Sequence, residues 1–165
     1  LMELGARIGA DIPFCIQGGT AMVRGYGEIL EPLEPLKNCR MLISKPPVGI
    51  STAECFARYD ALRKPYGIPG NPVIKKAVNA GDLSAVCQLF YNALEEVVEL
   101  PEVQEIRETM LKAGASGSCM TGSGSAVFGI FPRSEQQESA ARALKRKGYF
   151  TCRCSPVNYG ATITE

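Results

Sequence analysis

The 165-residue sequence contains no histidine, and this absence excludes several mechanisms. Ser-His-Asp and Cys-His catalysis both use an imidazole as the base, so neither is possible within this chain. Metal sites built on histidine are excluded for the same reason. Any general-base chemistry must therefore come from aspartate, glutamate, lysine or tyrosine.

The sequence also lacks a charge excess and a long apolar run. Its 18 lysines and arginines nearly balance 17 aspartates and glutamates, for a net charge of +1. This balance provides no basic surface for nucleic acid or for a membrane, so we expect neither as a partner. No apolar run approaches the roughly 20 residues of a membrane-spanning helix. The composition is that of a globular domain long enough to bury its own core.

Seven cysteines are spread along the chain, and no two form a C-x-x-C pair. An odd number without paired spacing predicts reduced cysteines in a cytoplasmic protein rather than a disulfide framework. Cys152 and Cys154 share one face of a predicted strand, but no second ligand pair accompanies them. We therefore expect no metal site in this chain.

From residue 38 onward, predicted strands alternate with predicted helices. Capping boxes begin two helices, at Ser51 with Glu54 and at Ser134 with Gln137. The pattern predicts an α+β sandwich, ferredoxin-like with extra helices. The expected strands cover residues 39–44, 126–131 and 149–155, the helices 51–63, 82–97, 101–114 and 134–148, and the loops 64–72 and 115–125.

The first 37 residues form a different segment. We expect the end of a helix, a tight loop around Asp11, a strand, a turn at Gly18 and Gly19, and a second strand. Pro13 favours an extended conformation at Ile12. Three-residue proline spacing in residues 31–36 predicts an extended crossing between domains. The predicted domains are therefore residues 1–37 and 38–165.

Asp11 is the first candidate functional residue, because a carboxylate on a tight loop can face a cleft. The structural alternative is a turn aspartate that bonds to nearby backbone N–H groups.

Two further features also allow a functional and a structural interpretation. Thr52 and Phe56 are spaced i and i+4 on one helix face, where they either grip a planar ligand or form ordinary surface and core. Residues 120–128 (MTGSGSAVF) join a loop to a strand. The loop is either a phosphate cradle of N–H and hydroxyl groups or a tight turn. It matches neither a Walker A loop nor a dinucleotide fingerprint.

Taken in chain order, six short runs resemble the GHMP kinases, a superfamily of small-molecule kinases. The resemblance covers nearly the whole chain. Thr121 stands where that family usually has serine, and Ala93 where it usually has aspartate. The runs are residues 8–14 (IGADIPF), 18–21 (GGTA), 25–28 (GYGE), 47–53 (PVGISTA), 92–95 (NALE) and 120–125 (MTGSGS).

The resemblance implies a ferredoxin-like GHMP kinase C-terminal domain, residues 38–165, preceded by the last strip of the N-terminal ATP-binding domain, residues 1–37. It implies transfer of the γ-phosphoryl group of ATP, with Mg²⁺, to a small molecule. The pattern points to the 2-hydroxyl of a cytidine diphosphate-linked methylerythritol, in non-mevalonate isoprenoid synthesis.

The resemblance also implies roles for particular residues. Asp11 would accept the hydroxyl proton, and Thr52 and Phe56 would line the substrate pocket. The residues of the implied phosphate-region loop are Gly122, Ser123, Gly124 and Ser125.

The family's glycine-rich ATP loop has no counterpart in these residues, so we expect it in an N-terminal segment outside this chain. We also expect the isolated chain to be inactive. Two alternatives stay open: another GHMP kinase, of the homoserine or mevalonate type, or an inactive folded fragment that acts only as a binding module.

Overall fold

The computed structural model describes residues 1–63 and 71–162, so most of the loop predicted at 64–72 lies outside the described residues. The chain divides into two compact units. Unit 1 comprises Leu1–Asn38, Asn71–Leu83 and Pro156–Glu165, and unit 2 comprises Cys39–Gly70 and Ser84–Ser155. The predicted boundary between residues 37 and 38, as a division between kinase domains, stays a prediction. In the part of the chain that the structure describes, no helix is long and apolar enough to cross a membrane.

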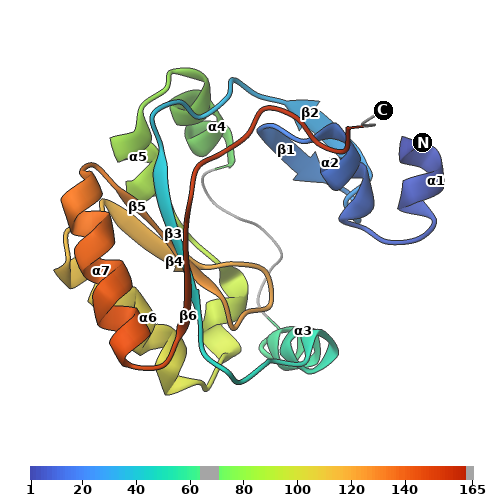
Figure 1. Ribbon diagram of the computed structural model, residues 1–165. Coiled ribbons are helices and arrows are strands. Elements are labelled where there is room, and N and C mark those ends of the chain that lie inside the picture. Colours follow the sequence, from blue (N-terminus) through green and yellow to red (C-terminus); the bar gives the residue numbers. More distant parts are fainter. Residues whose placement is uncertain (64–70, 163–165) are drawn as a thin grey trace. The chain divides into compact units, whose positions relative to one another are not determined.

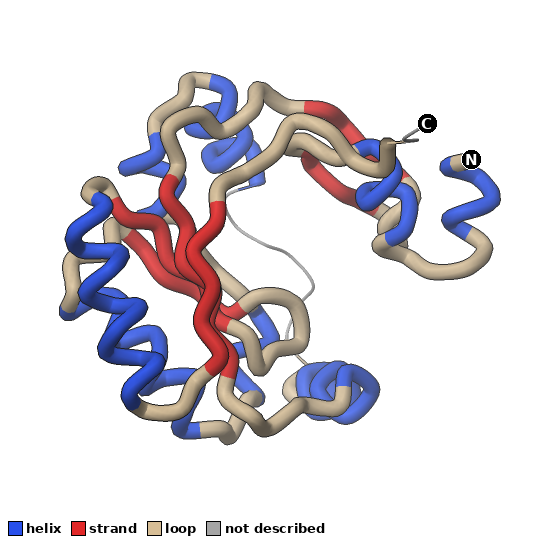
Figure 2. Tube along the Cα trace, viewed as in Figure 1, coloured by secondary structure: helices blue, strands red, loops and turns tan. Residues whose placement is uncertain are grey.

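A four-stranded antiparallel sheet forms the centre of unit 2 (Figures 1 and 2). Its strands lie in the order β4-β5-β3-β6. One helix, α6, precedes β4, and another, α7, joins β5 to β6, so the chain follows the β-α-β-β-α-β order of a ferredoxin-like fold. The predicted fold class is therefore confirmed. The bounds are β3 (Arg40–Lys45), β4 (Gly117–Met120), β5 (Val127–Phe131), β6 (Phe150–Cys154), α6 (Pro101–Lys112) and α7 (Ser134–Arg146).

The core of unit 2 lies between this sheet and the two helices α6 and α7, which cover the same face (Figure 1). Leu42 of β3 and Phe131 of β5 contribute buried side chains from the sheet. Ile106 of α6 and Leu144 of α7 are both 0% exposed and pack in the same cluster. The apolar spacing of the predicted helices accounts for these contacts, since residues three and four apart share one helix face.

Local helix signals predicted several boundaries correctly. The Ser51 hydroxyl accepts a hydrogen bond from the Glu54 N–H group at 3.4 Å and begins α3 (Thr52–Ala61). Helix α7 ends at Arg146, just before Gly148 with its positive φ of 83°, and the Tyr149 N–H donates to the Leu144 carbonyl oxygen at 3.2 Å. The capping box predicted for α7 is wrong. Arg133 is its N-cap, and the Gln137 side chain donates instead to the Met41 carbonyl oxygen of β3 at 2.8 Å.

Two predicted elements of unit 2 differ in the structure. The helix expected over residues 82–97 is interrupted, leaving α5 (Leu83–Gln88) and the 3₁₀ helix η1 (Ala93–Val97). Between them, Phe90 packs edge-on against Phe128 of β5, with ring centroids 5.0 Å apart. The loop expected over residues 115–125 contains β4, whose four residues are all buried. Pairing with β5 makes this small-residue segment a strand.

Unit 1 contains two short helices, a hairpin and one longer helix. The strand expected after Asp11 is a helix, because Pro13 occupies the first turn, where a missing N–H costs nothing. Residues 156–162 run beside it, and the Ala161 N–H donates to the Cys15 carbonyl oxygen at 3.1 Å. The bounds are α1 (Met2–Ala6), α2 (Ile12–Gln17), β1 (Ala21–Arg24), β2 (Ile29–Pro32) and α4 (Asn71–Asn79).

Candidate active site

Asp11 is the residue immediately before α2, in unit 1. Its backbone is helical, with φ −86° and ψ −13°, and its side chain does not cap the helix. The side chain is exposed, and no residue in the described ranges 1–63 and 71–162 donates a hydrogen bond to its carboxylate. The interpretation of Asp11 as a turn aspartate bonded to its own backbone therefore has no hydrogen bond in its favour. An exposed carboxylate without a partner is able to accept a proton from a substrate.

The turn between β1 and β2 packs against the loop that contains Asp11. Gly27 has φ +126°, and a Cβ atom there would lie 2.1 Å from the carbonyl oxygen of Ala10. The Glu28 carboxylate accepts a hydrogen bond from the Tyr26 N–H at 2.6 Å, which closes the turn. The turn at residues 25–28 therefore packs closely against Ala10, the residue that precedes Asp11.

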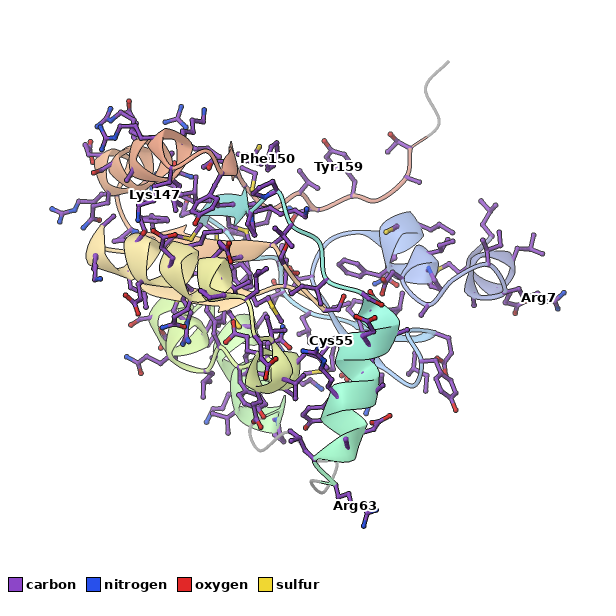
Figure 3. The ribbon with its side chains drawn as sticks, turned by 90° about the horizontal axis from the view of Figure 1, so that it is seen from below. Arg7, Cys55, Arg63, Lys147, Phe150 and Tyr159 are labelled. Atoms are coloured by element: carbon purple, nitrogen blue, oxygen red, sulfur yellow. The ribbon has the colours of Figure 1, made fainter. Side chains whose placement is uncertain are left out.

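Helix α3 of unit 2 presents Thr52 and Phe56 as exposed side chains on the same face. Phe56 is 52% exposed, so its ring is available to a ligand. A different face of the helix, which includes the buried Cys55, packs onto the rest of unit 2 (Figure 3). Beside Cys55, a cavity of about 180 Å³ reaches Arg58 and residues 97–99, away from the Thr52 face.

The glycine-serine loop at residues 121–125 connects β4 to β5 and meets α3. The Ser123 and Thr52 hydroxyl oxygens lie 2.8 Å apart, within hydrogen-bond distance. Ser125 is 0% exposed and donates to the carbonyl oxygen of Val48 at 2.5 Å. A Cβ atom at Gly124 would lie 2.5 Å from the sulfur of Met120, so no larger residue fits there without a shift. The structure thus brings the loop and Thr52 together, on one side of unit 2.

Asp11 belongs to unit 1, whereas Thr52, Phe56 and the loop at residues 121–125 belong to unit 2. Their meeting in one active site stays a prediction. In the sequence, residues 92–95 are only one of six short runs and carry no predicted role of their own. In the structure, Asn92 and Glu95 both bond to the strand and loop that lead to Ser123, and Arg107 bonds to the same strand. Only these tertiary contacts indicate that Asn92, Glu95 and Arg107 support the loop.

Two buried cysteines of unit 2, Cys39 and Cys119, are poor nucleophiles. All seven cysteines of the chain are free thiols. Burial raises the pKa of Cys39 to about 11. Burial, followed by the nearby Glu95 carboxylate, raises the pKa of Cys119 to about 12. Both therefore stay protonated near neutral pH and contribute to the core rather than to chemistry.

The described part of the chain offers few ligands to a metal ion. Among residues 1–63 and 71–162, no three or more side chains of histidine, cysteine, aspartate or glutamate form a group able to hold an ion. Mg²⁺ in kinases is usually held by one or two carboxylates together with the phosphates of the nucleotide. Residues 1–63 and 71–162 alone therefore form no complete protein site for such an ion.

Two kinds of sequence similarity connect this chain to known proteins. Residues 74–149 match the family model of the GHMP kinases C terminal domain. A 4-diphosphocytidyl-2-C-methyl-D-erythritol kinase of Alkaliphilus metalliredigens is 44% identical over 146 residues, covering 87% of this chain and 50% of the relative. The kinase of the same name from Geobacillus kaustophilus is 38% identical over 147 residues, covering 88% and 50%. The chain thus spans about half the length of these curated relatives.

Solved structures give the same picture of the fold. A crystal structure of 4-(cytidine 5'-diphospho)-2C-methyl-D-erythritol kinase superimposes with a TM-score of 0.73 and 29% identity, over 92% of this chain and 55% of that one. A homoserine kinase from Cytophaga hutchinsonii superimposes with a TM-score of 0.68 at 21% identity, over 92% and 52%, which shows likeness of fold alone. Residues 74–149 thus have the sequence pattern of the GHMP kinase C-terminal domain, and the chain has the fold found in that family.

Proposed function

We propose that the whole protein containing this chain phosphorylates the 2-hydroxyl of 4-diphosphocytidyl-2-C-methyl-D-erythritol, with ATP and Mg²⁺ as phosphoryl donor and cofactor. The observation that carries the proposal is the similarity along nearly nine-tenths of the chain to relatives that share this kinase name. The contact between Thr52 and Ser123 supports it, because it joins the two predicted substrate-binding elements of unit 2.

In the proposed reaction, Asp11 is the general base. The acceptor hydroxyl gives its proton to the Asp11 carboxylate as its oxygen forms a bond to the γ-phosphorus of ATP. The bond from that phosphorus to the β–γ bridging oxygen breaks, and ADP leaves. Phosphoryl transfer has a loose transition state, so orientation of the hydroxyl matters more than strong basicity. A carboxylate that accepts no hydrogen bond from the described residues suits that task.

The remaining elements would hold the acceptor. The exposed ring of Phe56 offers a flat surface for the cytosine, and Thr52 lies one helical turn away on the same face. Residues 122–125 would line the phosphate region. The nucleotide and Mg²⁺ would be bound mainly by an N-terminal segment outside these residues, which is also the predicted partner of this chain. We expect the whole protein to act in the cytoplasm, where seven free thiols stay reduced.

The test is phosphoryl transfer by the whole protein, with homoserine and mevalonate as competing acceptors. We expect turnover of the cytidylyl acceptor and little of the other two. Asp11→Asn should lower kcat by about 10²–10⁴-fold, the usual contribution of a positioned base, with acceptor KM nearly unchanged. Preference for homoserine or mevalonate would refute the proposed substrate, and near-normal kcat in Asp11→Asn would refute the proposed base.

A further inference from the structure

The loop at residues 121–125 is held in place by side chains from outside it. Its own backbone contributes two hydrogen bonds: Thr121 N–H to Ala126 at 2.9 Å, and Gly124 N–H to Thr121 at 3.0 Å. The Ser123 N–H has no acceptor among residues 1–63 and 71–162. The direction of this N–H group therefore depends on the hydrogen bonds that hold the neighbouring peptide groups.

Asn92 holds two of the carbonyl groups that lead into the loop. Its side-chain nitrogen donates to the carbonyl oxygen of Met120 at 3.0 Å and to that of Gly122 at 2.8 Å. Its side-chain oxygen accepts from the Leu94 N–H at 3.0 Å, which begins η1. Because the amide has donors on one side and an acceptor on the other, all three bonds fix one orientation of Asn92.

Glu95 holds the same strand end through the Met120 N–H. Its carboxylate accepts from the Met120 N–H at 2.5 Å and lies 3.7 Å from the Arg107 guanidinium. Arg107 in turn donates to the Ser118 carbonyl oxygen at 3.2 Å. Both polar groups of the Met120 backbone are thus bonded to side chains, and the strand end has little freedom to move.

The geometry of a peptide unit connects these bonds to the Ser123 N–H. In a trans peptide the carbonyl oxygen and the following N–H point in opposite directions. With the Gly122 carbonyl directed at Asn92, the Ser123 N–H is directed away from Asn92. The Ser123 hydroxyl lies beside Thr52, so this N–H belongs to a residue that already borders the predicted substrate site.

We propose that Asn92 is a positioning residue that aims the Ser123 N–H at a phosphate oxygen of the acceptor substrate. The inference rests on the proposed function, since it names the group through which the loop meets that substrate. A backbone N–H donating to an anionic oxygen forms a charge-assisted bond, stronger than a neutral one. Glu95 supports the same arrangement by holding Met120.

The decisive variant is Asn92→Asp, measured in the whole protein. The carboxylate keeps an acceptor for the Leu94 N–H but places an oxygen against the carbonyls of Met120 and Gly122, where a donor is needed. We expect the peptide group between Gly122 and Ser123 to rotate. The KM for the cytidylyl acceptor should then rise, so that its kcat/KM falls by about 10- to 150-fold, the equivalent of one hydrogen bond to a charged group. The KM for ATP should stay within about twofold if the loop meets only the acceptor.

The matched control is Ile106→Val, which destabilises the core of unit 2 without touching the loop. It should lower the unfolding temperature and leave both KM values unchanged. If Asn92→Asp does not fold, Asn92→Ala is measured against the same control. An acceptor KM that changes no more than the ATP KM, in either Asn92 variant, would overturn the positioning role.

The same measurements separate this inference from the proposed function. An active wild-type enzyme with an unaffected Asn92 variant refutes only the positioning role. A wild-type enzyme that does not phosphorylate the cytidylyl acceptor overturns the proposed function, and this inference with it.

Discussion

The substitution Gly27→Ala tests whether the hairpin turn of unit 1 positions the Asp11 loop. The new methyl carbon would lie 2.1 Å from the Ala10 carbonyl oxygen and 2.8 Å from its carbonyl carbon. Close C–H···O contacts require about 3.3 Å, so turn and loop must separate by about 3.3 − 2.1 = 1.2 Å. Both contact atoms are backbone, and no side-chain rotation relieves the overlap.

The backbone conformation adds a second cost. The φ of +126° at Gly27 lies well outside the left-handed well near about +57° that other residues occasionally occupy. Positive φ costs alanine about 1–2 kcal/mol, and overpacking costs about 1–3 kcal/mol more. We therefore expect Gly27→Ala to lower the free energy of unfolding by about 2–5 kcal/mol.

Activity should fall further than stability alone explains. Asp11 follows Ala10 directly, and a displacement of about 1 Å at a catalytic group can cost about 100-fold in rate. The assay is kcat of the whole protein at saturating ATP and acceptor, corrected for the folded fraction. We expect kcat about 100-fold below the wild type.

Gly81→Ala is the matched control for this prediction. Gly81 lies in unit 1 with φ +68°, and a Cβ atom there would meet nothing within 4 Å. It should lose about 1–2 kcal/mol of stability from the left-handed backbone and keep its kcat. Wild-type kcat in Gly27→Ala, or equal stability of the two variants, would refute the link between the turn and Asp11.

Three further predictions concern unit 2. Ile106→Ala truncates a fully buried side chain and should cost about 2–5 kcal/mol in urea unfolding; a loss below about 1 kcal/mol would contradict its core position. Hydrogen bonds from Lys147 and Tyr149 lower the pKa of Glu105, so its stabilising effect is present above the unfolded value of about 4.3 and is lost as pH falls through the folded value. Glu105→Gln should therefore flatten the acid side of the stability curve measured between about pH 2 and 7, and an unchanged curve would exclude this linkage. Phe56→Ala should raise the acceptor KM by the equivalent of about 1–3 kcal/mol, as for a lost base stack, with ATP KM unchanged; a constant acceptor KM would remove Phe56 from the site.

The structure connects residues 25–28 with the loop that contains Asp11. Gly27 lets the hairpin turn approach the Ala10 carbonyl, and Glu28 holds the turn closed through the Tyr26 N–H. Neither residue needs to touch a substrate to matter for activity. We predict that their role is mechanical support of the loop that carries the proposed base.

Local signals in the sequence were sufficient for much of unit 2. The Ser51 cap with Glu54, and the glycine that ends α7, act through hydrogen bonds within a few residues of one another. Alternation of strands and helices was enough to predict the ferredoxin-like class, since few arrangements bury both kinds of apolar face. Asp11 and Thr52 were predicted as site residues from short runs that resemble a known superfamily, and those roles stay predictions.

Contacts between distant parts of the chain determined the remainder. Pairing with β5 made residues 117–120 a strand, and packing of Phe90 on Phe128 accompanies the break in the predicted helix at residues 82–97. Gln137 bonds to Met41, 96 positions away, rather than capping its own helix.

The candidate site shows the same difference between local signals and long-range contacts. The sequence by itself determined which residue types are available: a carboxylate at Asp11, a hydroxyl at Thr52 and a glycine-serine loop with Ser123. Only the tertiary structure showed that Asn92 holds the peptide before Ser123, because that bond joins residues 30 positions apart. Local periodicity reports which face of an element is apolar, but it contains no information about which distant polar group that element will meet.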